Sequence, residues 1–342
     1  MKKLMLCGGC GFIGSNFVNM ALNKGDEVLV YDNLTYAGHK ESLPIDKIQF
    51  VEGDIANYHL IEKTIREFKP DVVINFAAET HVDRSLSGFK SVGKFLHSNS
   101  YGVYILAVAC YKYNTYLHLI NTDEVFGDIQ ENDPPFTEDS QFKPNNPYSV
   151  AKATGDLLLR SFARTNPNFK YTISYCTNNY GPYQSPEKLL PRAILKVMNG
   201  EKVPIYTDVN GNVGLNRRDW IFVDDHCEAI YQIINSNKYG EKYCIAGKQE
   251  LSNIQLIEIL LKQMGKQNWE DWVQAVQDRP GHDFRYALTI NKITNELGWT
   301  PKVKIEDGLK RTVDWYLGAG KKWVNSISRI GNEVRKGQDK KI

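Results

Sequence analysis

Short apolar runs alternate with helical patterns along the first half of the chain. Strands are predicted at residues 3–7, 27–31, 48–51, 71–76, 116–120 and 171–176, where runs rich in Val, Ile, Leu and Phe occur. Helices are predicted at residues 15–23, 58–68 and 91–113, and another helix begins near residue 147. Because parallel strands need crossover connections, this alternation predicts an α/β fold whose parallel sheet is covered by helices on both faces.

A glycine loop joins the first predicted strand to the first helix. Gly8, Gly11 and Gly14 have GxxGxxG spacing, and Asp32 ends the next strand. Such a loop lets the backbone approach a pyrophosphate at a helix N-terminus, while a carboxylate after the second strand accepts hydrogen bonds from the adenosine ribose. That carboxylate repels a 2′-phosphate, so the pattern favours NAD over NADP. The alternatives are a purely structural glycine turn and a turn aspartate without a ligand.

The pattern changes after residue 181, where the predicted elements become shorter and richer in Pro, Trp and Tyr. We predict a Rossmann-type, doubly wound NAD-binding domain over residues 1–180, to which later segments, about 217–246, return. A smaller, interleaved C-terminal substrate lobe is predicted mainly over 181–318, followed by a basic tail at 319–342. Residues 209–216 are interpreted as an exposed hairpin or loop.

Candidate catalytic groups follow the strand at 116–120 and begin the helix near 147. Tyr148 and Lys152 are four residues apart, so they share one helix face. An adjacent ammonium and a positive nicotinamide would both lower the phenol pKa. Thr122, Asp123 and Glu124 emerge where the strand ends, and two adjacent carboxyls in a desolvated pocket tend to share one proton. The alternatives are a surface Tyr–Lys pair and carboxyls that cap a turn.

Composition excludes several classes of function. The 342 residues carry a net charge of +2, which gives no reason to expect a nucleic-acid or membrane partner. There is neither a signal-peptide pattern nor an apolar run approaching the ~20 residues that cross a bilayer. Cys7 and Cys10 have CxxC spacing, but no second such pair completes a zinc site, so we expect no bound metal. Six reduced, partly buried cysteines in a cytoplasmic protein are the favoured interpretation.

Longer motifs resemble the dTDP-glucose 4,6-dehydratases of the extended short-chain dehydrogenase/reductase superfamily. The similarity covers about residues 2–318 and is carried by GGCGFIGSN (8–16), LTYAG (34–38), AAETHVDRS (77–85), TDEVFG (122–127), PYSVAKA (147–153), NNYGP (178–182), PEKLLP (186–191), RDW (218–220), DH (225–226) and DRPGHDFRYA (278–287). The TDE triplet and the DRPGHD segment are far more specific than the glycine loop.

The resemblance implies a reaction with no net redox change. Tyr148 would take the proton of the sugar 4-hydroxyl while carbon 4 gives a hydride to NAD⁺, and Thr122 would hydrogen-bond that oxygen. Glu124 would then remove the proton at carbon 5, and Asp123 would protonate the hydroxyl leaving carbon 6. Return of the hydride to carbon 6 yields a 4-keto-6-deoxy sugar nucleotide.

Binding residues are implied by the same resemblance. The cofactor would be held by Gly8, Gly11, Phe12, Ile13, Gly14, Asp32, Asn33, Thr35, Asp54, Ile55, Ala77, Ala78, Thr80, Asn99, Tyr148, Lys152 and Cys176. The sugar nucleotide would be held by His81, Thr122, Asn178, Glu187, Lys188, Leu189, Tyr206, Arg218, Asn253, Arg279 and His282. Surface ion pairing is the alternative for the two arginines, and a structural wall position is the alternative for His81.

Departures from the family pattern leave the nucleotide open. Asn121, Phe126, Tyr175, Thr177 and Cys10 stand where Ser, Tyr, Arg, Ser and Ala are usual, and the loop at 210–216 is longer. A UDP- or GDP-sugar dehydratase, a 4-epimerase and a silent NAD-binding scaffold are the competing functions. The resemblance also implies a homodimer through residues 92–113 and 148–164.

Overall fold

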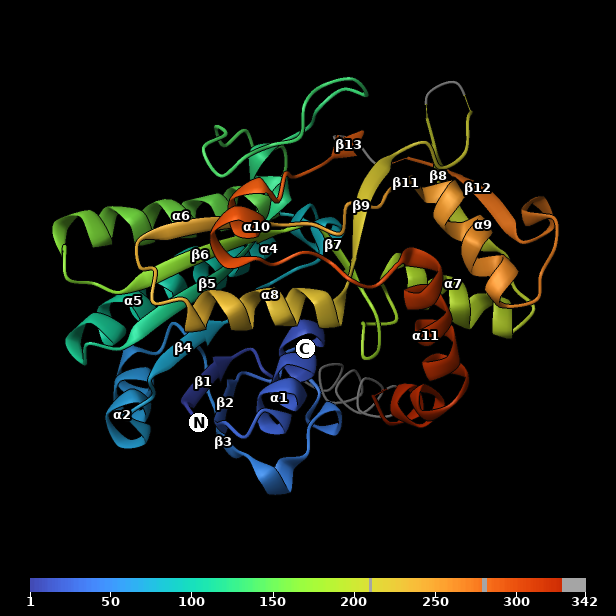
Figure 1. Ribbon diagram of the computed structural model, residues 1–342. Coiled ribbons are helices and arrows are strands. Elements are labelled where there is room, and N and C mark those ends of the chain that lie inside the picture. The colour runs from blue at the N-terminus through green and yellow to red at the C-terminus, as the bar shows by residue number, and fades with distance from the viewer. Residues whose placement is uncertain (209–210, 279–281, 328–342) are drawn as a thin grey trace.

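Seven parallel strands form the central sheet, in the order β10-β6-β5-β4-β1-β2-β3 (Figure 1). Its strands are β1 (Lys3–Cys7), β2 (Glu27–Asp32), β3 (Gln49–Glu52), β4 (Val72–Asn75), β5 (Tyr116–Thr122), β6 (Tyr171–Cys176) and β10 (Glu241–Ile245). The structure is a computed structural model and describes residues 1–208, 211–278 and 282–327. β4 and β5 are buried along their whole length, which explains their continuous apolar runs.

Helices cover both faces of this sheet, so the predicted doubly wound, Rossmann-type fold is confirmed. On one face α1 (Phe12–Asn23) packs against α8 (Val223–Asn235). On the other face α5 (Gly102–Lys112) lies between α2 (Tyr58–Phe68) and α6 (Pro147–Thr165). Helix α6 begins with a capping box between Asn146 and Ser149 and with proline as its first residue, which fixes where the helix starts.

The strand order reverses between β1 and β4, which are neighbours although they are far apart in sequence. A crevice opens at the carboxyl ends of the strands at such a point, and ligands bind there in doubly wound sheets. Gly8 follows β1 with a φ of +79°, and a Cβ on it would come within 2.4 Å of the Ala77 nitrogen after β4. Only glycine therefore allows the two loops to meet at the switch point.

The helix predicted at 91–113 is divided by a π-helical turn. It consists of α4 (Phe89–Leu96), the π turn η3 (His97–Tyr101) and α5. Within this turn Asn99 is buried, and its side-chain amide accepts from the backbone nitrogen of Glu79 and donates to the Glu79 carbonyl, both at 2.9 Å. The extra residue in the turn thereby aims Asn99 at the loop after β4.

A second lobe has its own hydrophobic core, which includes Ile194, Ile205, Leu256, Leu260 and Leu309. Its elements are β7 (Asn178–Tyr180), α7 (Leu189–Met198), β8 (Val203–Thr207), β9 (Arg217–Phe222), β11 (Glu250–Ser252), α9 (Asn253–Gln263), η5 (Trp269–Asp271), β12 (Val273–Gln277), β13 (Arg285–Tyr286) and α11 (Ile305–Leu317). The chain leaves this lobe after β9 to form α8 and β10 of the main domain, so the two parts interleave (Figure 1).

The smaller elements connect these parts of the chain. They are the short helices η1 (Lys40–Ser42), η2 (Ile45–Lys47), α3 (Val82–Ser85), η4 (Asp123–Phe126) and α10 (Asn291–Leu297). The predicted loop at 209–216 is closed at its base by an isolated antiparallel β-bridge between Thr207 and Val213. The Asp208 nitrogen also donates to the Asn212 carbonyl. Residues 209 and 210 of that loop lie outside the described residues.

Residues 319–327, assigned from sequence to a basic tail, form a helix that packs on the main domain. Trp323 is buried, and its indole nitrogen donates to the Ser42 hydroxyl at 2.9 Å. Its ring also meets the edge of His39, which lines the crevice. This part of the C-terminal segment therefore belongs to the fold, while residues 328–342 lie outside the described residues.

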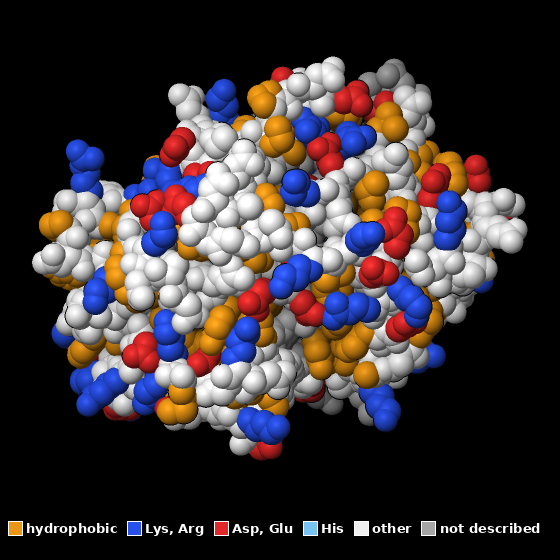
Figure 2. Space-filling model, viewed as in Figure 1, with side chains coloured by type: hydrophobic (Ala, Val, Ile, Leu, Met, Phe, Trp, Pro, Cys, Tyr) orange, Lys and Arg blue, Asp and Glu red, His pale blue; other side chains and the backbone are white. Residues whose placement is uncertain are grey.

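The surface in Figure 2 carries basic and acidic side chains interspersed, with hydrophobic side chains in small groups. Within the described residues, helices long and apolar enough to cross a membrane are absent. The six cysteines are all buried and none forms a disulfide. No cluster of three or more His, Cys, Asp or Glu side chains in the described ranges could hold a metal ion.

We predict that Gly155→Ala will destabilise the protein, because a Cβ on Gly155 of α6 would lie 2.1 Å from the Asn99 carbonyl oxygen. Overpacking of this kind costs about 1–3 kcal/mol. Gly93→Ala is the matched control, since nothing lies within 4 Å of its Cβ, and it should gain up to about 1 kcal/mol of helix propensity. Thermal unfolding measures both changes, and equal stability of the two variants would contradict the prediction.

Candidate active site

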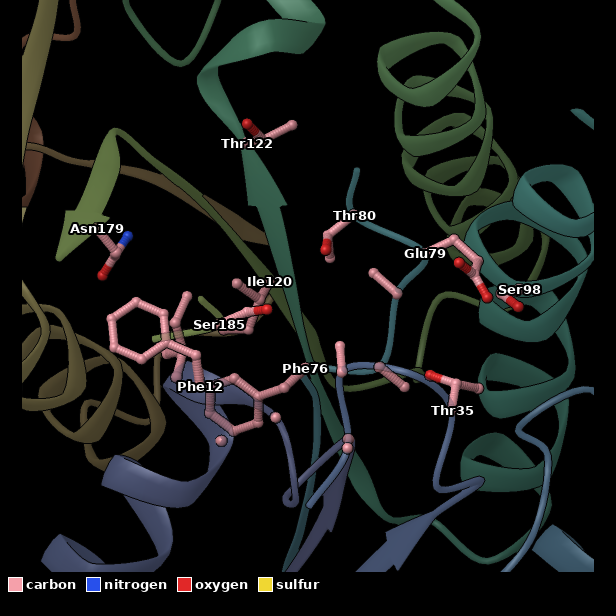
Figure 3. Close-up of a pocket in the computed structure, with 18 of the residues that line it drawn as sticks. Phe12, Thr35, Phe76, Glu79, Thr80, Ser98, Ile120, Thr122, Asn179 and Ser185 are labelled. Carbon is pink, nitrogen blue, oxygen red and sulfur yellow. The ribbon is translucent and has the colours of Figure 1, made fainter. Parts of the chain in front are cut away.

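The crevice at the switch point is a pocket of about 320 Å³. It runs across the carboxyl ends of β1, β2, β4, β5 and β6 and is closed by residues 176–188 at the entry to the second lobe. Figure 3 shows Thr122 at the end of β5, between Asn179 on one side and Thr80 on the other, with Phe12 of α1 below. Its position and size are those of a small-molecule site in a doubly wound sheet.

The glycine loop forms the floor of this pocket. A Cβ on Gly14 would lie 2.3 Å from the Gly8 carbonyl oxygen, so the first turn of α1 sits directly on the loop. The predicted helix started at Ser15, whereas α1 starts at Phe12. The backbone nitrogens of that first turn therefore begin inside the glycine motif, where a pyrophosphate would lie.

Asp32 is buried beside the loop, at 6% exposure. Its Oδ2 accepts from the Cys10 nitrogen at 2.9 Å and its Oδ1 from the Leu34 nitrogen at 2.8 Å. Burial raises the pKa of Asp32, and these backbone donors oppose the rise. A carboxylate has about four lone-pair sites, so acceptor capacity for ribose hydroxyls remains. Asp32 therefore joins the glycine loop to the loop after β2, and it also lines the pocket.

Every residue predicted to bind the cofactor lines this pocket, except Asn99. Asn99 lies behind the lining and fixes the backbone of Glu79, which does line it. Further lining residues that the sequence analysis did not assign are Tyr31, Ala37, Gly38, His39, Gly53, Phe76, Glu79, Ser98, Ile120, Asn121, Thr177, Asn179, Tyr183, Gln184 and Ser185. Several of these residues are sequence neighbours of the motif residues that were assigned to the cofactor. That proximity in sequence is the signal that could have identified them.

The TDE triplet forms the end of β5 and the start of η4. The Thr122 hydroxyl donates to Asp123 Oδ1 at 3.1 Å and accepts from the Glu124 nitrogen at 3.4 Å. Thr122 therefore caps the turn. The alternative considered for Asp123 and Glu124 was that they cap this turn, and Thr122 has that role instead. Asp123 is buried, and its Oδ2 has no hydrogen-bond partner among the described residues.

Asp123 has the chemistry of a general acid. Burial and the neighbouring Glu124 raise its pKa to about 8, and Arg218 and the Thr122 hydrogen bond only partly oppose them. A carboxylic acid that keeps its proton at neutral pH can protonate a leaving group. Glu124, beside it, is half-buried and also lines the pocket.

Tyr148 and Lys152 lie on the face of α6 that meets the end of β5, and each is 8% exposed. The Lys152 ammonium donates to the Ile120 carbonyl at 2.7 Å, and burial lowers its pKa to about 8. Burial and Glu124 raise the pKa of Tyr148 well above its ordinary value, although a hydrogen bond with Thr122 lowers it in part. The expected lowering of the phenol pKa is therefore not produced by the protein groups alone, because desolvation and the neighbouring carboxyls of Glu124 and Asp123 outweigh the Thr122 hydrogen bond.

The predicted substrate residues fall into two groups. Thr122, Asn178, Glu187 and Lys188 line the pocket. His81 does not line it, and its ring is 3.9 Å from Glu187, which also meets Arg84 at 3.2 Å. The Lys188 ammonium donates to the Thr80 carbonyl at 3.3 Å, so the second lobe is tied to the loop after β4.

The second group lies in the second lobe, outside the pocket lining. Arg218 is buried on β9 and donates to the carbonyls of Arg217, Asp283 and Phe284. His282 lies 3.1 Å from this guanidinium and edge-on to Tyr206. Leu189 begins α7 and Asn253 begins α9. Arg218 is therefore buried among backbone carbonyls, and within the described part of the chain it does not form the surface ion pair that was its alternative. Arg279 lies outside the described residues.

Comparisons with known proteins agree with this fold. A sequence model described as GDP-mannose 4,6 dehydratase matches residues 5–312. The dTDP-glucose 4,6-dehydratase of Neisseria meningitidis is 38% identical over 96% of this chain and 97% of its own length. Among solved structures, DesIV, a dTDP-glucose 4,6-dehydratase from Streptomyces venezuelae solved with NAD bound, is 41% identical with a TM-score of 0.85 over 92% of this chain and 96% of its own.

A related activity shares the fold. The UDP-glucose 4-epimerase of Thermotoga maritima has a TM-score of 0.84 at 27% identity and covers 93% of this chain and 99% of its own. The two dehydratases have a higher sequence identity to this chain than the epimerase has, and they cover a similar share of it. The chain therefore belongs to the sugar-nucleotide 4,6-dehydratase family, and it is similar within that family to the dTDP-glucose 4,6-dehydratases.

Proposed function

We propose that this protein is an NAD-dependent hydro-lyase that dehydrates dTDP-D-glucose to dTDP-4-keto-6-deoxy-D-glucose in deoxysugar biosynthesis. The observation that carries the proposal is Asp123, a buried carboxyl whose pKa is raised to about 8 beside the Thr122 hydroxyl and the Tyr148 phenol. An epimerase needs no such acid. The dehydratases to which the chain is similar support the same reaction.

The pocket fits NAD, because the floor between Gly8 and Gly14 leaves no room for side chains and Asp32 keeps acceptor capacity. We assign the lining residues after β1, β2 and β4 to its binding. When bound, NAD supplies the acceptor and donor of a hydride.

The catalytic roles are assigned to groups of this chain. Tyr148 takes the proton of the sugar 4-hydroxyl, and Thr122 holds that oxygen. Glu124 removes the proton at carbon 5, which the 4-ketone acidifies, and Asp123 gives its proton to the hydroxyl that leaves carbon 6. Lys152 lies one helical turn beyond Tyr148 and provides a positive charge near the phenol.

Arg218, His282 and Tyr206 are proposed to bind the nucleotide diphosphate, with Asn178, Glu187 and Lys188 nearer the sugar. Arginine forks suit a diphosphate. The choice of dTDP over UDP or GDP rests on the relatives, and turnover of a panel of the three sugar nucleotides tests it. We also propose a cytoplasmic location, with which the six unpaired thiols are consistent.

Glu124→Gln should abolish elimination while leaving partial reaction at carbon 4. The amide cannot accept the carbon 5 proton, so formation of the keto sugar should fall by about 10²–10⁴-fold. Absorbance of the keto sugar in alkali measures the first effect, and the near-ultraviolet absorbance of NADH that builds up on the enzyme measures the second. A variant that forms the keto sugar at the wild-type rate would contradict the role of Glu124.

The rate of dehydration should fall as the pH rises through about 8. Above that pH Asp123 loses the proton that it must donate. Asp123→Asn should have much lower kcat, and its pH profile should lose the Asp123 part of this limb and keep only that of Lys152, whose pKa is also about 8. The folded state also holds this proton at pH values where the unfolded state has lost it, so the Asp123 contribution to stability declines between about pH 4 and pH 8. Unfolding free energies of wild type and Asp123→Asn at pH 5 and 8 test the sign.

We also propose that the protein is a homodimer. Large apolar side chains remain exposed on the outer faces of η3, α5 and α6, namely Tyr101, Tyr104, Tyr111, Val150, Leu157 and Leu158. An exposed apolar patch of this kind is typical of a protein–protein interface. These helices are the same segments that the sequence predicted for a dimer.

Leu157→Glu should shift the protein from dimer toward monomer, because a carboxylate would be buried at the interface. Leu157 is 52% exposed in the single chain. Leu317→Glu on α11 is the control, since Leu317 is 42% exposed and lies away from α5 and α6. Light scattering measures both masses, and a monomeric wild type would refute the dimer.

A further inference from the structure

The face of α6 that carries Tyr148 and Lys152 continues one turn further to Asp156. The three residues recur at intervals of four, so they form one row along the helix. Asp156 is completely buried, although it is a carboxylate and lies outside the pocket lining. A buried carboxylate is costly unless its oxygens are hydrogen-bonded and its charge is balanced.

Three donor groups, each from a different element, meet this requirement. Asp156 Oδ2 accepts from the Asn121 amide at 3.2 Å and from the Tyr175 hydroxyl at 2.8 Å. Its Oδ1 accepts from the Arg160 guanidinium at 2.5 Å, which also supplies the balancing charge. The contacts therefore join α6 to the ends of β5 and β6, next to the catalytic triplet.

Two of these partners are positions at which the resemblance described from the sequence implies a different residue. Asn121 stands where serine is usual and Tyr175 where arginine is usual. The structure brings both substitutions to the same carboxylate, where a neutral phenol faces Asp156 and Arg160 provides the cation. Asn121 and Tyr175 therefore belong to one hydrogen-bond network.

Asn121 also connects Asp156 to the reacting groups. Its Oδ1 accepts from the Thr122 backbone nitrogen at 2.9 Å while its amide donates to Asp156. One turn earlier, Lys152 donates to the carbonyl of Ile120. Consecutive turns of α6 therefore hold consecutive residues of β5, and the position of Tyr148 relative to Thr122 depends on both attachments.

We propose that Asp156 is a positioning residue of the active site, which fixes α6 against the ends of β5 and β6 through Asn121 and Tyr175 and so sets the geometry between Tyr148 and Thr122. This inference rests on the proposed function for its kinetic readout. The titratable groups that act on Lys152 are Cys176 and Asp156, and those around Asp156 are Arg160, Tyr171 and Tyr175.

The test compares Asp156→Asn with a matched control, Asp26→Asn. Asp26 is also buried and accepts from a backbone nitrogen and a tyrosine hydroxyl, those of Lys2 and Tyr231, but it lies at the opposite end of β1 from the pocket. Both variants should lose thermal stability. Misplacement of a catalytic group can cost up to about 10²-fold in rate, so Asp156→Asn should lower kcat at least ~10-fold with little change in KM. Asp26→Asn should keep the wild-type kcat.

The pH profile separates positioning from loss of structure. Burial lowers the pKa of Lys152, and the Asp156 charge opposes this, so Asp156→Asn should lower that pKa further and move the alkaline limb of kcat to lower pH. Asn121→Ser and Tyr175→Phe each remove one hydrogen bond to Asp156 and keep its ion pair with Arg160. These two variants replace Asp156→Asn in the test if that variant does not fold. We expect each to lower kcat in the same direction by a smaller factor. Wild-type kcat and pH profile in these variants would overturn the proposal.

A titration without substrate keeps this result separate from the proposed function. The phenol of Tyr148 is followed by ultraviolet absorbance in the holoenzyme, as the difference between each protein and its Tyr148→Phe counterpart. Loss of the Thr122 hydrogen bond removes a contribution that lowers the phenol pKa, so Asp156→Asn should titrate at higher pH than wild type. An unchanged titration overturns the positioning role, whereas a wild type that converts no sugar nucleotide refutes only the proposed function.

Discussion

Desolvation at the carboxyl end of β5 is the constraint on which the site depends. It keeps a proton on Asp123 to about pH 8, lowers the pKa of Lys152 to about 8 and raises that of the Tyr148 phenol. Each shift follows from the same cause, because a charged group loses more than a neutral one when water is removed. The chemistry of elimination needs the first shift, while proton abstraction by the phenol is opposed by the third. The site must therefore supply positive charge where the phenol acts.

The fold provides this dry environment through its interleaved lobes. Residues 176–188 pass from the main sheet to the second lobe and close the pocket, and the contact between Lys188 and Thr80 ties them to the loop after β4. The same passage carries β7, which pairs with β9 and so connects the pocket to Arg218. The arrangement places the proposed nucleotide-binding groups on one lobe and the catalytic groups on the other.

Much of the sheet could be predicted from the sequence, because buried parallel strands are continuous apolar runs and their helices have a clear period. The helix at 58–68 and the strand at 3–7 agree with the structure residue for residue. The π turn could not be predicted, since it accompanies a tertiary contact between Asn99 and Glu79 that residue spacing does not show. The docking of Trp323 on Ser42 is likewise a contact between distant segments, and it lies in the region that the sequence assigns to a basic tail.

Within the site, residue types predicted location better than electrostatics. The cofactor residues of the motifs line one pocket because the motifs sit at the ends of neighbouring parallel strands. The sequence predicted that Lys152 and a bound nicotinamide together lower the pKa of Tyr148. Without the nicotinamide, burial raises that pKa, and spacing along a helix shows which groups are close but not how much water surrounds them. On the proposed function this result has a consequence. A phenol that protein groups keep neutral needs the positive charge of a bound nicotinamide to release its proton, so the first proton transfer depends on an occupied cofactor site. Hydride acceptance and proton abstraction are then coupled by electrostatics, and the Tyr148–Lys152–Asp156 row is the element that holds the phenol where that charge acts on it.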